Sequence, residues 1–189
     1  MKSIGTFEIK SGKVVVTDPC YEINEKSTLN KIINVKNGTW NAYICEGHST
    51  KVCALLICHK DNNQIKQIEG LDAYTLLGYT NHITKIGVDS GQAGFFDINH
   101  FKNDYDTVNQ TIADFIDVND LGDKWYAMCC HLTCNTENSA GVVPYGVVAQ
   151  SGYGDGRYNV YADCEGDDKV STILQIEFAE QHYDSDSDD

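Results

Sequence analysis

The sequence is short of arginine, proline and long apolar runs. Arg157 is its only arginine, and Pro19 and Pro144 are its only prolines. Proteins that bind duplex nucleic acid or anionic membranes need clustered basic side chains, so we expect neither partner here. Apolar stretches such as residues 53–58 are far too short to cross a bilayer, and no apolar leader follows Met1. We therefore expect a cytoplasmic protein.

Acidic side chains outnumber basic ones two to one. The 189 residues hold 28 Asp or Glu against 14 Lys or Arg, which gives a formal net charge of −14. Divalent cations and basic protein surfaces are the partners that this charge favours, although acidity also serves solubility alone. A hydrophobic share of 41% is ordinary for a globular protein, and the length suits one domain.

The eight cysteines are expected to be free thiols buried in the core, because no secretory leader points to an oxidising compartment. The only dense group is Cys129, Cys130, His131 and Cys134, and it lacks the C-x-x-C spacing of a structural zinc site. Cys20 would be a nucleophile only if a nearby cation or histidine lowered the pKa of its thiol.

Alternating apolar and polar side chains predict strands along most of the chain. The predicted strands are residues 6–10, 13–17, 38–45, 51–59, 83–88, 94–97, 125–133, 141–151, 157–164 and 170–178. The first two are expected to form a hairpin about the turn at Ser11 and Gly12.

Two helices are also predicted: a short one over residues 25–33, and one over residues 105–118, where apolar residues have helical spacing. The expected fold is therefore mainly β, a β-sandwich or a partly open barrel, with one or two short helices. Residues 1–179 are expected to form one domain. Residues 180–189 are too acidic to bury anything and are expected to be a disordered tail.

Three segments combine aspartate with glycine at the ends of predicted strands: residues 14–21, 87–97 and 151–161. Aspartate in such a turn often accepts hydrogen bonds from backbone amides close by, which is a structural role. Alternatively, the carboxylates of Asp18, Asp89, Asp97 and Asp155 converge, and together they bind Ca²⁺ or Mg²⁺. No EF-hand loop is present to strengthen that second interpretation.

A candidate binding site is drawn from the same three segments. Its residues are Asp18, Tyr21, Asp89, Ser90, Asp155, Arg157 and Tyr158. Tyr21 and Tyr158, together with Trp40 and Tyr153, would supply aromatic contacts to a partner.

Six short stretches of the sequence together resemble a bacterial and protist family known only as a domain of unknown function, DUF4241. They are TDPCY at 17–21, GTW at 38–40, VDSGQAG at 88–94, WY at 125–126, AGVVPYG at 140–146 and SGYGDGRY at 151–158. The resemblance runs from about residue 10 to residue 178. It implies a compact β-rich domain whose shared residues sit on Asp/Gly turns, and it implies no activity.

Three classes of function stay open. A non-enzymatic binding or interaction domain is favoured, because no nucleophile–base signature is present and neither Ser90 nor Ser151 fits G-x-S-x-G. The alternative is a hydrolase that uses a metal or the carboxylates of Asp18, Asp89 and Asp155. The second alternative is a structural protein that assembles with copies of itself through strand edges, as a homo-oligomer.

Overall fold

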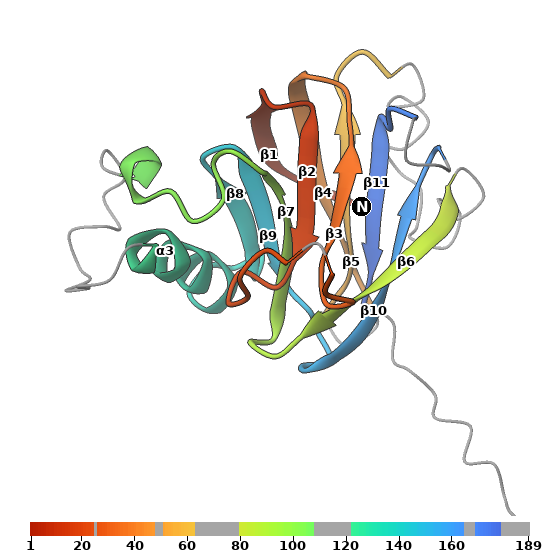
Figure 1. Cartoon of the computed structure of the whole chain (residues 1–189). Coiled ribbons are helices and arrows are strands. Elements are labelled where there is room, and N and C mark those ends of the chain that lie inside the picture. Colours follow the sequence, from red (N-terminus) through yellow and green to blue (C-terminus); the bar gives the residue numbers. More distant parts are fainter. Residues whose placement is uncertain (25, 48–50, 63–79, 108–121, 165–168, 179–189) are drawn as a thin grey trace, which may run out of the picture.

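Two antiparallel sheets pack face to face, and one α-helix covers the outer side of the second sheet (Figure 1). The computed structural model describes residues 1–24, 26–47, 51–62, 80–107, 122–164 and 169–178. The prediction of a mainly β fold is confirmed, and of the two expected architectures the structure has the sandwich.

The order of the strands in space differs from their order in the chain. The first sheet has the order β1 (Lys2–Ile9), β4 (Gly38–Glu46), β5 (Val52–His59), β11 (Ile173–Glu177), β10 (Gly156–Ala162) and β6 (Asn81–Val88). The second sheet has the order β3 (Lys31–Asn34), β2 (Lys13–Thr17), β7 (Gln92–Asp97), β9 (Gly146–Gln150) and β8 (Ala140–Val143). The described helices are a short 3₁₀-helix, η2 (Asp104–Thr107), and α3 (Asp123–Cys134).

The second sheet is buried on both faces, which explains its unbroken apolar strands. In β2, Val14 and Val16 point into the main core between the sheets, because successive side chains of a strand point to opposite faces. Val15 points the other way and packs with Phe96 and Trp125 beneath α3. All three valines are fully buried.

The predicted hairpin of residues 6–10 with 13–17 is wrong. β1 pairs with β4 in the first sheet, whereas β2 pairs with β3 and β7 in the second. The connection at Ser11 and Gly12 carries the chain across the sandwich instead of turning it back within one sheet. The carboxylate of Asp97 holds this connection by accepting hydrogen bonds from the backbone N–H groups of Lys10 (2.7 Å) and Ser11 (2.8 Å).

The predicted strand over residues 125–133 is also wrong, because this segment lies in α3. Its buried residues are Trp125, Met128, Cys129 and Thr133, which is the spacing of one helical face and not of a strand. The cysteine pair at 129–130 is therefore on a helix. The predicted single strand over residues 141–151 is in fact the hairpin of β8 and β9.

The helix predicted over residues 25–33 does not form in the described part of that segment, where a turn leads into β3. The β-branched side chains of Ile32 and Ile33 suit a strand better than a helix. Of the helix predicted over residues 105–118, only the η2 turn falls among the described residues. Residues 108–118 and the predicted tail at 180–189 lie outside them. In the described part of the chain, no helix has the length and apolarity to span a bilayer.

Candidate functional site

Two of the three Asp/Gly segments meet at one end of the sandwich. Residues 89–91 connect β6 to β7, and residues 151–155 connect β9 to β10, so each carries the chain between the sheets. The backbone N–H of Ser151 donates to the carbonyl of Gly91 (2.9 Å), which places the two connections side by side. We call this region, together with residues 18–21, the crossover end.

Asp18 joins the first segment to this end through its carboxylate. Oδ2 accepts the backbone N–H groups of Asp89 (2.8 Å) and Ser90 (2.7 Å). Oδ1 accepts the Ser90 hydroxyl (2.6 Å) and the backbone N–H of Cys20 (2.8 Å). Asp18 is fully buried. Four donors from the protein thus surround the two oxygens, and the role of this carboxylate is to fasten β2 to the β6–β7 connection.

Asp97 lies at the opposite end of the second sheet. β2 and β7 are antiparallel, with Val14 opposite Asp97 and Thr17 opposite Gly94. The residues that follow β2 and the C-terminal end of β7 therefore lie at opposite ends of the sheet. Burial opposes ionisation of the Asp97 carboxyl. The backbone N–H groups that it accepts outweigh burial and lower its pKa.

The prediction that Asp18, Asp89, Asp97 and Asp155 gather around one cation is therefore wrong. The antiparallel pairing of β2 with β7 separates Asp97 from the crossover end. Within the described ranges, no three His, Cys, Asp or Glu side chains are grouped so as to hold a metal ion. Asp18 and Asp97 instead accept hydrogen bonds from backbone amides of turns and connections, the structural role named above.

The other predicted residues of the crossover end have separate surroundings. Burial raises the pKa of the Tyr21 phenol, and the nearby carboxylate of Asp89 raises it further. Tyr158 is 4% exposed, and its hydroxyl donates to the carbonyl of Gly154 (2.8 Å), so it braces the β9–β10 connection. Asp155 is exposed. Arg157 donates from Nη2 to the carbonyl (3.1 Å) and hydroxyl (3.0 Å) of Thr28.

The thiols near the crossover end are poorly suited to nucleophilic chemistry. Burial, assisted by the carboxylate of Asp18, raises the pKa of Cys20 to about 12. Burial also raises the pKa of Cys129 well above its usual range. A thiol is nucleophilic as its thiolate, so these groups stay protonated and unreactive at neutral pH.

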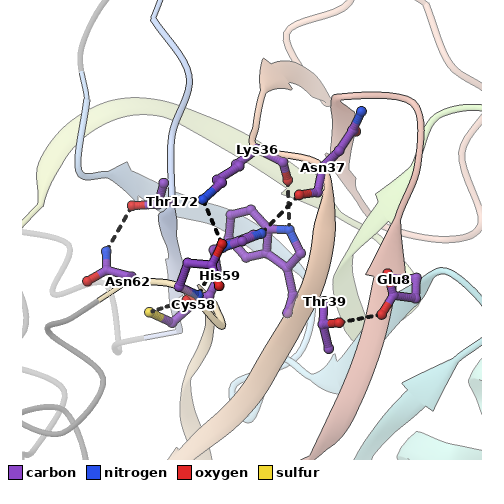
Figure 2. A network of polar contacts seen from close by, with 10 residues as sticks. Glu8, Lys36, Asn37, Thr39, Cys58, His59, Asn62 and Thr172 are labelled. Carbon is purple, nitrogen blue, oxygen red and sulfur yellow. Dashed lines mark hydrogen bonds and ion pairs between the residues drawn. The ribbon is translucent and has the colours of Figure 1, made fainter.

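One buried histidine lies in a polar network that ties β4, β5 and the start of β11 together (Figure 2). His59 Nε2 lies 3.0 Å from the carbonyl of Asn37, and Nδ1 accepts the backbone N–H of Asp61 (3.1 Å). A carbonyl can only accept and an amide N–H can only donate, so this pairing suits a neutral imidazole with its proton on Nε2. Both ring nitrogens of His59 are used by the fold.

A second histidine, His100, lies near Asp97 at the opposite end of the second sheet. The spacing of residues in the sequence gave no indication of its contacts. His100 Nδ1 is 2.6 Å from Asp106 Oδ2, and the ring stacks on Tyr145 at 3.7 Å between centroids. Lys10 Nζ donates to the Tyr145 hydroxyl (2.7 Å). Tyr145 has a φ of 61°, which is unusual for a residue with a side chain. The contacts hold the β8–β9 turn against the chain after β7.

A groove of about 1210 Å³ lies between β3 and β6, and we call it the basic groove. Four consecutive residues from each of these strands line it, at 31–34 and 82–85. Five of the lining side chains are basic: Lys13, Lys31, Lys85, Arg157 and Lys169. None of the sixteen described lining residues is acidic. At the composition of this chain, sixteen residues drawn at random would carry about one basic and about two acidic side chains.

A family model described as a protein of unknown function, DUF4241, matches residues 7–175. The chain belongs to the DUF4241 family. No curated protein and no solved structure matches it. The DUF4241 match extends from β1 into β11 and includes every residue that lines the basic groove, as well as all three segments of the crossover end.

In this DUF4241 chain, sequence reasoning found the crossover end but missed the basic groove. Its five cations are spread from residue 13 to residue 169, so no local window of the sequence shows a basic cluster. Arg157 was the one groove residue among the predicted site residues. A signal for two of the others is the presence of Lys31 and Lys85 on the two strands that become sheet edges.

Proposed function

We propose that this chain is a non-enzymatic binding domain that holds an anionic ligand in the basic groove. The observation that carries the proposal is the charge of the lining: five cations and no carboxylate among its described residues, in a protein of net charge −14. Like charges that share one concave surface repel each other, and an anionic ligand relieves that repulsion.

The rest of the lining supports the same function. Hydroxyl and amide side chains of Ser27, Thr28 and Asn30 can donate hydrogen bonds to anionic oxygens. Ile32 and Ile83 supply apolar surface that lowers the local dielectric and strengthens charge–charge attraction. Specific ligand sites commonly combine apolar walls with a few convergent polar groups.

The hydrolase alternative has less support. Asp18, one of the three carboxylates proposed for it, is fully buried, and four protein donors surround its oxygens. The homo-oligomer stays a prediction, which sedimentation at several protein concentrations would check.

The test is a calorimetric titration with inorganic tripolyphosphate at about 20 mM NaCl, with glucose as the neutral comparison. Tripolyphosphate is expected to bind and glucose is not. The double variant Lys85→Glu/Lys169→Glu should weaken tripolyphosphate binding roughly ten-fold or more, because it reverses two groove charges. Both lysines are exposed, so the fold should tolerate the change.

The matched control is Lys2→Glu/Lys124→Glu, which changes the net charge equally at exposed lysines outside the groove. It should reduce binding less than three-fold, roughly the effect of net charge alone. Equal losses in the two double variants, or no binding by the unaltered chain, would overturn the proposal.

A further inference from the structure

The basic groove faces the backbone edges of two strands and not their flat faces. Along a strand, successive side chains point to opposite faces, so a hollow on one face is lined by every second residue. Here four consecutive residues of β3 (31–34) and four consecutive residues of β6 (82–85) line the groove. Both strands are edges of their described sheets, since β3 pairs with β2 and β6 with β10.

At one end of the groove, β6 contacts the segment that leads into β3. The backbone N–H of Gly87 donates to the carbonyl of Leu29 (3.1 Å), and a Cβ on Gly87 would lie 2.5 Å from a Leu29 methyl carbon. At the other end of β3, Ser171 donates its N–H to the carbonyl of Asn34 (3.0 Å). Between these fixed points lies the lined stretch of β6, where His82 and Lys85 are exposed.

We propose that the anionic ligand is an extended acidic segment of another polypeptide, which adds to the edge of β6 as a further strand. This inference rests on the proposed function and names the class of ligand for the same groove. Strand addition uses the backbone groups of an edge for affinity and side chains for selectivity. β6 is favoured over β3 because it is the longer strand, with eight residues against four.

The charges of the groove select the partner. Lysine on an edge strand discourages pairing with a second copy of the same edge, because the lysines of the two copies would face each other. The same lysines attract a strand that carries carboxylates. In an added strand, alternate side chains point to one side, so a segment with Glu or Asp at every second position would present one row of carboxylates to the groove.

The test uses two peptides of equal charge. The first alternates Glu and Thr over about eight residues, a length that matches β6, and the second replaces one central Thr with Pro. Proline removes a backbone N–H donor and disfavours strand pairing without changing the charge. Calorimetry is expected to show that the alternating peptide binds at least ten-fold more tightly than the proline peptide. The alternating peptide should also slow amide hydrogen exchange at residues 82–85 more than at 31–34.

Each other outcome overturns the inference in a distinguishable way. Equal binding of the two peptides shows attraction by charge alone. Binding of tripolyphosphate without binding of either peptide shows a groove for small anions, and the proposed function survives. Protection from hydrogen exchange that is confined to residues 31–34 shows that the peptide adds to the edge of β3 and not to that of β6. If no anion of any kind binds, the proposed function fails together with the inference.

Discussion

At the scale of single residues, buried aspartates fix the paths of the connections between the sheets. Asp18 and Asp97 are both fully buried, and each accepts backbone N–H groups from a connecting segment, one at each end of the second sheet. A short carboxylate suits this role because it accepts several hydrogen bonds while its backbone stays within a turn. The role of these two residues is to stabilise the fold.

Replacing Asp18 with Asn is expected to destabilise the protein by about 3 kcal/mol. The substitution removes the charge and turns one acceptor oxygen into an N–H₂ donor that faces other donors. Urea unfolding at pH 7 measures the change. Asp155→Asn is the matched control and should stay within about 0.5 kcal/mol, because Asp155 is exposed. An Asp18→Asn protein as stable as the unaltered chain would show that these hydrogen bonds contribute little.

At the scale of elements, the fold depends on connections that cross between the sheets. The sequence predicted most strands, but it predicted that neighbours in the chain would pair, as β1 and β2 do not. The β9–β10 connection shows how tightly such a crossing is packed. Gly152 and Gly154 both have positive φ values, of 70° and 86°, yet their surroundings differ.

Gly152→Ala is expected to destabilise the protein by more than about 3 kcal/mol, because left-handed strain and a clash act together. The added Cβ would lie 2.1 Å from the carbonyl oxygen of Val52, which is backbone and cannot swing aside. Gly154→Ala should lower the free energy of unfolding by only about 1–2 kcal/mol, because the same backbone strain acts alone: nothing lies within 4 Å of the added Cβ. Thermal and urea unfolding of both variants measure the difference, and equal losses would contradict this account.

At the scale of the whole molecule, net charge and local charge have opposite signs. The chain carries a formal charge of −14, while the described lining of the basic groove holds five cations and no carboxylate. General repulsion among carboxylates opposes the compact state, whereas the clustered cations favour the anionic ligand that we propose for the groove. Dissolved salt screens both effects, since the Debye length is about 10 Å at 0.1 M.

Raising NaCl from about 10 to 300 mM is therefore expected to raise the melting temperature by about 2–4 °C while it weakens tripolyphosphate binding. Scanning calorimetry and the binding titration measure the two responses on the same sample. The Lys85→Glu/Lys169→Glu variant is more acidic, so salt should raise its melting temperature by more than it raises that of the unaltered chain. A melting temperature that falls with salt would show that attractive ion pairs outweigh general repulsion.

The sequence alone determined the β-rich class, the family and the positions of most strands, because these follow from local alternation and from motifs such as residues 151–158. It also indicated the turns that form the crossover end, since Asp and Gly are common in sharp turns. The helical face of residues 125–133 was open to a strand interpretation, because a short apolar segment fits both periods. Only the tertiary structure separated Asp97 from Asp18 and brought Lys13, Lys85 and Lys169 to one groove. The reason is physical: which strands pair, and which edges are left over, depends on contacts between residues far apart in the chain, and no local pattern records those contacts.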